Sequence, residues 1–187
     1  MKWAFSLAIV LCALCAFAQP QPESKRMSRI WSSIDDRLDR QSDYWFENGD
    51  FPRVIQLLRM RCEFHPHDSD LATNLGWMYG NIERYDDELA AYRRYAKRNP
   101  ADPDALLPVA EFFFSKKMYD KVPPLLEPTL PRKPQPNAFR ILAHAYEKMG
   151  KWEQARVVWE KLLVLTPDDL AAKANLAKVK KKLSAKR

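Results

Sequence analysis

Glycine and cysteine are scarce in this sequence. Of 187 residues, 4 are Gly and 3 are Cys. So few glycines leave little material for a glycine-rich phosphate-binding loop or for the many tight turns of an all-β fold. The chain is too short for a two-domain enzyme, and its hydrophobic content of 47% is too high for a disordered chain. We therefore expect one small folded protein.

The first eighteen residues have the features of a secretory signal peptide. Lys2 is followed by an apolar run that ends at Phe17, and the small residues Ala16 and Ala18 precede Gln19. The run is shorter than the roughly 20 residues that a membrane-spanning helix needs. We expect cleavage near Gln19 and a mature protein that is exported, periplasmic or secreted.

Two of the three cysteines, Cys12 and Cys15, lie in this leader. Its removal leaves Cys62 alone, and one thiol cannot form an intramolecular disulfide. Cys62 follows Leu57, Leu58 and Met60 in an apolar helical stretch, which favours a small buried side chain. A reactive or intermolecular thiol is the alternative.

Residues of the same kind recur along the chain at intervals of 33 or 34. The prolines of the series are Pro66, Pro100, Pro134 and Pro167. Two series are aromatic (Phe51, Tyr85, Tyr119, Trp152; Trp45, Tyr79, Phe113, Tyr146), one is small (Ser42, Gly76, Ala110, Ala143, Ala177) and one is large and apolar (Leu58, Tyr92, Leu126, Trp159). Five concordant series predict a chain built from similar stacked units.

Each unit has the pattern of two amphipathic helices. Apolar residues recur at three- and four-residue spacing between successive prolines. In the second unit, Leu75, Gly76 and Tyr79 share one face of the first helix, and Tyr85 starts the second. The small residue lets the two helices approach closely, and Pro100 ends the unit because proline cannot continue a helix.

Two units carry the clearest motif. It reads Leu75-Gly76-x-x-Tyr79, Tyr85, Tyr92, Pro100 in one and Leu142-Ala143-x-x-Tyr146, Gly150, Trp152, Ala155, Trp159, Pro167 in the other. These residues resemble the tetratricopeptide repeat, over residues 35–169. The resemblance implies an all-α fold, an α-solenoid of antiparallel helix pairs, with units at 35–68, 69–102, 103–135 and 136–169. Residues 19–34 would extend or cap the first helix, and residues 170–187 would form a basic capping helix.

Prolines crowd the second half of the third unit. Pro123 and Pro124 fit the first turn of a helix, but Pro128, Pro131 and Pro134 do not fit a helix interior. We expect a short second helix there with an extended exit. Harmless variation in a surface loop and a local opening that reshapes the groove are both open interpretations.

The net charge of +7 belongs to one end of the chain. Residues 171–187 carry seven Lys or Arg and no acid, so the rest of the mature chain is near neutral. No aromatic residues alternate with these cations, and we expect no nucleic-acid partner. A solvated cap is the simplest interpretation, and contact with a membrane or wall polymer through the basic tail is the alternative.

No catalytic constellation is present. The sequence has no nucleophile elbow, no Walker loop and no Cys-x-x-Cys motif. His65 and His67 flank Pro66 in a linker, and two loop histidines without a third fixed ligand make a poor zinc site. We expect no enzymatic activity, no cofactor and no metal. A metal or small-molecule carrier that uses this linker is a remote alternative.

The resemblance implies binding on a concave surface lined by the first helix of each pair. Helical phase predicts that the partner-binding residues are Asp39, Asp43, Glu47, Asn74, Trp77, Asn81, Glu111, Phe114, Arg140 and His144, with Asp36, Thr73, Leu107 and Glu147 on the same face. Chaperone-binding members of the family clamp a carboxylate with lysines and asparagines. The corresponding positions here are largely acidic, aromatic or aliphatic, so that activity is not expected.

The acidic row beside Trp77 and Phe114 predicts a basic or amphipathic protein or peptide as the partner. An ordinary solvated acidic face is the alternative. The leading hypothesis is a non-enzymatic exported scaffold that binds a protein in the cell envelope through this groove. The second is an envelope- or wall-associated structural protein held by its lysine-rich C-terminal helix.

Overall fold

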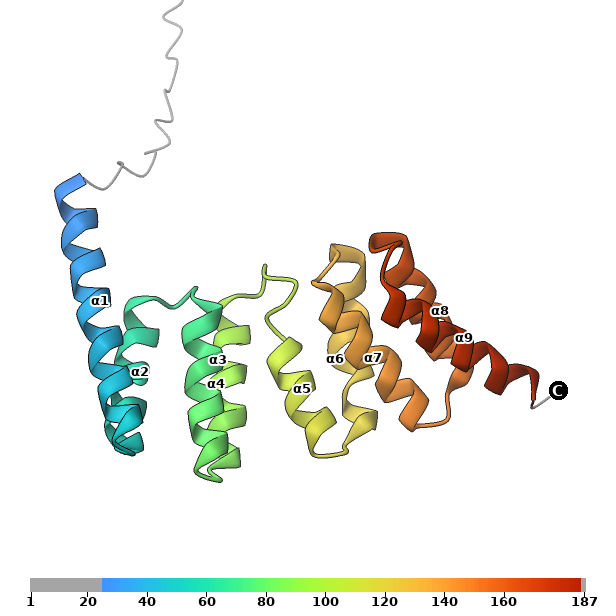
Figure 1. Ribbon diagram of the computed structural model, residues 1–187, viewed down its shortest axis with the longest axis horizontal. Coiled ribbons are helices and arrows are strands. Elements are labelled where there is room, and N and C mark those ends of the chain that lie inside the picture. Colours follow the sequence, from blue (N-terminus) through green and yellow to red (C-terminus); the bar gives the residue numbers. More distant parts are fainter. Residues whose placement is uncertain (1–24, 186–187) are drawn as a thin grey trace, which may run out of the picture. The chain divides into compact units, whose positions relative to one another are not determined.

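The computed structural model describes residues 25–185, and its regular elements there are helices (Figure 1). The α-helices are α1 (Lys25–Glu47), α2 (Phe51–Phe64), α3 (Ser69–Asn81), α4 (Tyr85–Arg98), α5 (Leu107–Ser115), α6 (Pro123–Leu126), α7 (Pro136–Lys148), α8 (Trp152–Leu165) and α9 (Leu170–Ser184). Two 3-10 helices, η1 (Tyr119–Lys121) and η2 (Glu127–Arg132), flank α6. The expected signal peptide, residues 1–18, lies outside the described residues.

The chain divides into two compact units, residues 1–41 and 42–187. The described part of the first unit is the stretch of α1 up to Gln41, which carries Asp36 and Asp39 as exposed side chains. The second unit, which we call the repeat body, begins with the last turns of α1 and contains all the helices from α2 to α9. The two units are described separately.

Each helix of the repeat body packs on its neighbours in the chain. Helix α3 packs on α2 and α4, α5 on α4 and α7, and α8 on α7 and α9. The link between α3 and α4 is short, as in an antiparallel helix hairpin. Packing within a helix pair and between successive pairs is the architecture of an α-solenoid, so the predicted all-α solenoid of helix pairs is confirmed.

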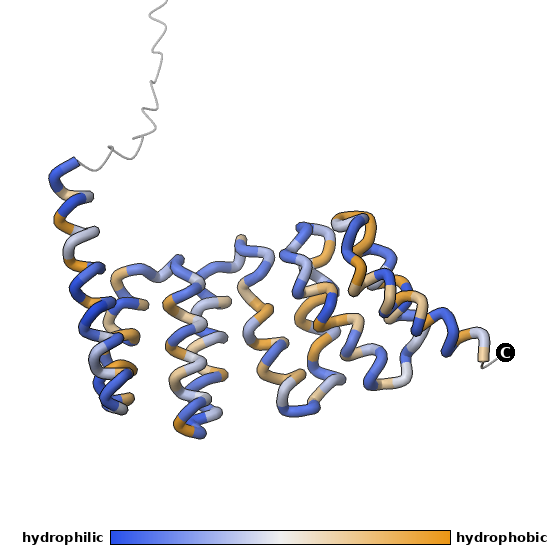
Figure 2. Tube along the Cα trace, in the orientation of Figure 1, coloured by the Kyte–Doolittle hydropathy of each residue, from blue (hydrophilic) through white to orange (hydrophobic). Residues whose placement is uncertain are grey.

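Small residues lie where the helices cross. Ala110 and Ala143 have no exposed surface, and Gly76 is buried against the Tyr92 ring of the next helix. Trp159 is also fully buried, and Tyr79 is 6% exposed. Apolar and polar stretches alternate along each helix in Figure 2, which is the pattern of helices that bury one side.

The buried apolar side chains form separate clusters. A smaller cluster joins α2 and α3 and includes Val54, Leu75 and Tyr79. A larger one runs from Tyr92 on α4 to Val179 on α9. The core of the repeat body is therefore divided along the row of helices.

The backbone repeats the period of the sequence. Gly49, Glu83, Lys117 and Gly150 all have positive φ angles, between 61° and 72°. Each lies in the turn between the first and second helix of a pair. The same left-handed turn therefore closes four successive pairs, two of them without glycine.

The third pair differs from the others, as its prolines predict. Helix α6 is only four residues long, begins at Pro123, and continues into the 3-10 helix η2 with Pro131 inside it. Proline lacks the N–H that an α-helix interior needs, so the chain changes to the tighter turn of a 3-10 helix.

No helix among residues 25–185 is long and apolar enough to cross a membrane.

Candidate functional site

The first helices of the pairs, α3, α5 and α7, share one surface of the repeat body, which we call the first-helix face. A hollow of about 450 Å³ lies on it between residues of α3, α5 and the start of α7. Four carboxylates line this acidic hollow, and no Lys or Arg does: Asp70, Asp102, Asp104 and Glu111. Leu107 lies in its wall and is 4% exposed, so the predicted groove position is occupied by a buried apolar side chain.

Hydrogen bonds hold several of these carboxylates in place. The Tyr95 hydroxyl donates to Asp102 at 2.8 Å, and the backbone N–H of Gln135 donates to Asp104 at 2.8 Å. The Asn137 amide donates to Glu111 at 2.6 Å and links α7 to α5. The acids are thus oriented by contacts between successive pairs. The lining contains no Lys or Arg, and the nearby Arg132 guanidinium donates to the backbone carbonyls of Pro100 and Asp102.

Glu111 is the predicted site residue at the centre of this arrangement. Its side chain is half-buried, and burial raises the pKa of its carboxyl above the ordinary value, while the hydrogen bond from Asn137 opposes that shift. A carboxylate deprived of part of its hydration is stabilised by a cation that approaches from the hollow.

Exposed aromatic rings lie on α1 and α3 within the repeat body. The Phe46 and Trp77 rings are 6.0 Å apart at their centres, and the residues are 42% and 50% exposed. Four predicted partner-binding residues are exposed on the same two helices: Asp43, Glu47, Asn74 and Asn81. The prediction of an aromatic beside acids missed Phe46, which adds a second ring to Trp77.

The predicted residues farther along the chain have partners of their own. Phe114 is half-buried, with its ring edge on Tyr119 at 5.2 Å. Arg140 forms an ion pair with Asp169 at 2.6 Å, which connects α7 to the start of α9. His144 packs edge-on against Trp159 at 5.0 Å and lies 3.4 Å from Glu147.

Glu147 belongs to the same set of interhelix contacts. Its side chain is 7% exposed, and it accepts a hydrogen bond from the Trp159 indole at 2.9 Å. Lys178 of α9 lies 3.4 Å from it. The structure thus brings Glu111 and Thr73 together at the acidic hollow, while Arg140, His144 and Glu147 connect α7 to the last two helices.

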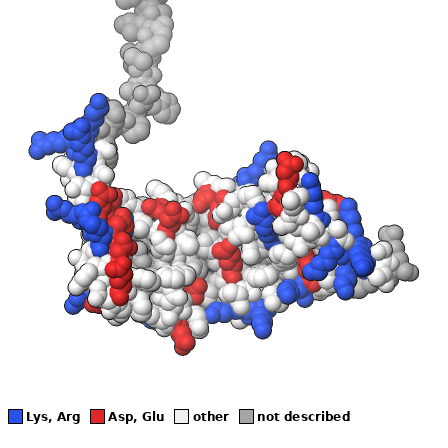
Figure 3. Space-filling view, viewed as in Figure 1, with Lys and Arg blue, Asp and Glu red and all other residues white. Residues whose placement is uncertain are grey.

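Charge is distributed unevenly over this surface. In Figure 3, acidic side chains are visible over α3 and α5, and Lys and Arg gather over the last helices. Asp70, Asp102, Asp104 and Asn137 were not predicted as site residues. They lie at or near helix starts and in linkers, so the helical phase used for the prediction did not reach them. The signal that was available is the pair of acids that follows Pro66 and the pair that follows Pro100.

The histidine linker has structural contacts. His67 Nδ1 is within hydrogen-bond distance of the Asn99 amide oxygen, and the Asn99 amide donates to the Pro66 carbonyl at 2.9 Å. These contacts tie the first inter-unit linker to the next one. Among the residues that the structure describes, no group of three or more His, Cys, Asp or Glu side chains is arranged to hold a metal ion.

Comparison with known proteins agrees with this architecture. Residues 136–179 match the family model of the tetratricopeptide repeat. No curated protein is significantly similar in sequence. A crystal structure of the MamA protein is similar, with a TM-score of 0.62 and 16% identity over 80% of this chain and 82% of that one. MamA from Desulfovibrio magneticus RS-1, from residue 41 to its end, has a TM-score of 0.56 and 16% identity, over 80% and 91% of the two chains.

The class of the protein follows from these observations. The described part of the chain is an α-solenoid of helix pairs, and residues 136–179 within it match the tetratricopeptide repeat. Its fold is that of the MamA structures, and at this level of identity the likeness concerns the fold alone.

Proposed function

We propose that this protein is an exported, non-enzymatic scaffold that binds a basic or amphipathic segment of another protein on its first-helix face. The observation that carries the proposal is the acidic hollow, in which four carboxylates converge without a lining Lys or Arg. Such a site attracts positive charge, and the attraction raises the rate of association and selects among partners.

The rigidity of the hollow supports the same conclusion. Asp102, Asp104 and Glu111 are already held by hydrogen bonds from neighbouring pairs. A surface that is ordered before binding loses little conformational entropy when the partner arrives. The exposed Phe46 and Trp77 rings offer an apolar contact of the kind that anchors amphipathic segments.

Fluorescence anisotropy with labelled peptides tests the proposal. The probes are an amphipathic peptide rich in Lys and Arg and a matched peptide in which Glu replaces those residues. We expect binding of the basic peptide that weakens as salt is raised. The variant Glu111→Lys with Trp77→Ala should lose it. The control variant, Asp120→Lys with Val164→Ala, makes the same charge change at exposed positions that do not line the hollow.

Equal affinity of both variants would overturn the assignment of the site, and equal affinity for the two peptides would overturn the charge argument.

Export is tested separately. The amino terminus of the protein recovered from its own host should begin near Gln19, and recovery of a chain that begins at Met1 would exclude processing.

The second candidate function is attachment to an anionic envelope surface through α9. Lys178 and Lys180 form ion pairs with Glu147 and Glu160, at 3.4 and 3.1 Å, while Lys173, Lys181 and Lys182 are exposed. Val179 is buried, so removal of the whole helix would disturb the fold. Replacing Lys181 and Lys182 by Gln tests attachment with the core intact: release from the envelope supports this function, and unchanged fractionation contradicts it.

A further inference from the structure

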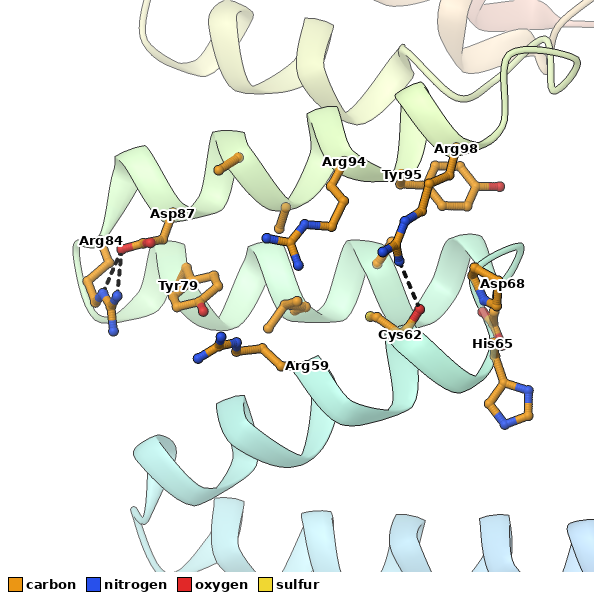
Figure 4. Close-up of a pocket in the computed structure, with 15 residues that line it drawn as sticks. Arg59, Cys62, His65, Asp68, Tyr79, Arg84, Asp87, Arg94, Tyr95 and Arg98 are labelled. Carbon is orange, nitrogen blue, oxygen red and sulfur yellow. Dashed lines mark hydrogen bonds and ion pairs between the residues drawn. The ribbon is translucent and has the colours of Figure 1, made fainter.

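A second cavity lies between α2, α3 and α4, and its lining differs in charge from the acidic hollow (Figure 4). Its volume is about 170 Å³, and four arginines surround it: Arg59, Arg84, Arg94 and Arg98. We propose that this arginine cavity binds a small organic anion, an oxyanion group carried on a short apolar body. Its four arginines lie outside the acidic hollow, and Tyr95 lines both cavities.

The arginines come from different helices and converge. In Figure 4, Arg59 from α2 and Arg94 from α4 extend over the cavity from opposite sides, while Arg84 and Arg98 stand at its two ends. The guanidinium is permanently charged, planar and suited to bidentate contact with carboxylate or phosphate oxygens. Two such groups facing one space form a clamp for an oxyanion.

The end arginines have close acidic partners, whereas the central ones keep donors available. Arg84 pairs with Asp87 at 2.7 Å, and Arg98 with Glu63 at 2.6 Å. Arg94 reaches the same Glu63 through one nitrogen at 3.3 Å. The Arg59 guanidinium donates to the amide oxygen of the uncharged Gln56 at 3.4 Å. Each guanidinium has five donors, so Arg59 and Arg94 retain capacity for a ligand.

The walls below the arginines are apolar in part, and Asp68, whose carboxylate accepts from the N–H groups of Asp70 and Leu71, also lines the cavity. Ala72, Leu75 and Tyr79 of α3 form one wall, and Ala90 and Ala91 of α4 form another. An inorganic ion would leave this surface in contact with water, whereas an anion with a short aliphatic or aromatic body would cover it. A cavity of roughly 150 Å³ can hold one benzene-sized molecule, so a small ligand fits this volume.

Helix spacing explains how the cavity arises. Arg59 and Arg94 are 35 residues apart, as are Glu63 and Arg98, which places each pair at nearly the same position of successive second helices. The repeat period therefore stacks side chains of α4 beside those of α2. The sequence analysis searched the first helices for a site and did not consider this stacking.

Isothermal titration calorimetry tests the proposal with hexanoate and hexyl phosphate, at constant ionic strength. Saturable binding of one or both is expected, and the tighter ligand identifies the oxyanion. Arg59→Gln and Arg94→Gln should each weaken it by about tenfold or more, since each removes charge-assisted hydrogen bonds. Arg93→Gln is the matched control, because Arg93 adjoins Arg94 but lies over the Phe113 ring.

A second test fills the cavity and leaves every charged residue in place. Ala90 lines the cavity and is exposed, so Ala90→Leu should fold normally and block the ligand. Unchanged affinity in Ala90→Leu, or equal affinities in Arg94→Gln and Arg93→Gln, would overturn the location. Absence of saturable binding of both anions to the wild-type protein would overturn the proposal itself.

Cys62 gives a readout at the site. Its thiol lines the cavity, and burial together with nearby acids raises its pKa, so alkylation is measured at alkaline pH. Peptide mapping by mass spectrometry separates Cys62 from Cys12 and Cys15. Hexanoate or hexyl phosphate should slow alkylation of Cys62 in the wild type and not in Arg94→Gln. Equal protection in both proteins would contradict binding at this cavity.

Discussion

Gly76 of α3 lies directly against the aromatic ring of Tyr92 of α4. A Cβ atom added at Gly76 would overlap three carbons of that ring. Gly76 belongs to the small series of the sequence period, and Tyr92 belongs to the large apolar series. Their contact sets the distance between the two helices of the second pair.

Gly76→Ala is therefore expected to destabilise the protein. Tyr92 is 8% exposed and cannot move without disturbing the core. Overpacking of this kind costs about 1–3 kcal/mol, measured as the free energy of unfolding in urea. The double variant Gly76→Ala with Tyr92→Leu should recover part of the loss, because the smaller side chain makes room.

Gly80→Ala is the matched control on the same helix. Its added Cβ would meet the carboxylate end of Glu88, at 2.9 Å, and that flexible side chain can turn away. Replacing a helical glycine with alanine then raises stability by about 1 kcal/mol. A comparable loss for both variants would show that close approach at Gly76 is not the cause.

The left-handed turns give a second prediction. Lys117 has a φ of 61° and Gly150 a φ of 71°, in corresponding turns, and the space around Gly150 is open. Lys117→Gly should stabilise the protein by roughly 0.5–1 kcal/mol, and Gly150→Ala should destabilise it by roughly 1–2 kcal/mol, because L-residues are strained in this region. Thermal unfolding measures both. Stabilisation by Gly150→Ala would contradict the turn geometry.

Asp169 should make stability depend on acid pH. It accepts a hydrogen bond from the Ala172 N–H at the start of α9 and pairs with Arg140, and both contacts lower the pKa of its carboxyl. Its contribution is therefore present above the ordinary pKa of about 4 and lost as pH falls through the lowered value.

Unfolding midpoints of Asp169→Asn and wild type, measured from pH 7 down to pH 2, check this. The wild type should be the more stable at pH 7, and the difference should shrink as the pH falls. Asp168→Asn is the control at the neighbouring exposed residue. A difference that does not change with pH would contradict the role of the charge.

Glu111 should show the opposite dependence. Burial raises the pKa of its carboxyl, so the folded state holds its proton at a pH where the unfolded chain has lost it. Stability then falls as pH rises through the interval between the ordinary and the raised value. Glu111→Gln keeps an acceptor for Asn137 and should be more stable than wild type at pH 7, with the gain vanishing below pH 4.

The same substitution should weaken binding of the basic peptide, because it removes a negative charge from the acidic hollow. Gain of stability with loss of binding is the combination expected of a residue retained for function. Unfolding in urea and peptide anisotropy on one preparation measure the two effects. Loss of stability at pH 7 would show that the carboxylate serves packing instead.

The sequence was most informative about positions that pack. Leu58, Tyr92, Leu126 and Trp159, one series of the period, are all buried. The pairing of the helices could also be predicted from the sequence, because a small residue of one helix meets a large residue of the next in the repeated pattern. The small series departs from this rule at its last member, because Ala177 of α9 is exposed.

The candidate site was less predictable. Helical phase could be applied to Glu111 and Trp77 because their helices are regular: Glu111 lines the acidic hollow and Trp77 is exposed, and their part in binding stays a prediction. Asp102 and Asp104 lie in the linker before α5. A linker has no helical period from which the direction of a side chain could be predicted. The arginine cavity forms because the second helices of two successive pairs, α2 and α4, lie side by side. The pattern within one repeat unit does not predict which side chains of two units meet.

The division of the core has a consequence for cooperativity. Tyr79 belongs to the cluster that joins α2 and α3, and Tyr92 to the larger one. In a linear array each block unfolds with its own free energy, so amide hydrogens of α2 and α3 should exchange before those of α7 and α8. The arginine cavity spans both blocks, since α2, α3 and α4 all line it. An occupant would therefore couple the two unfolding transitions and slow exchange in the weaker block.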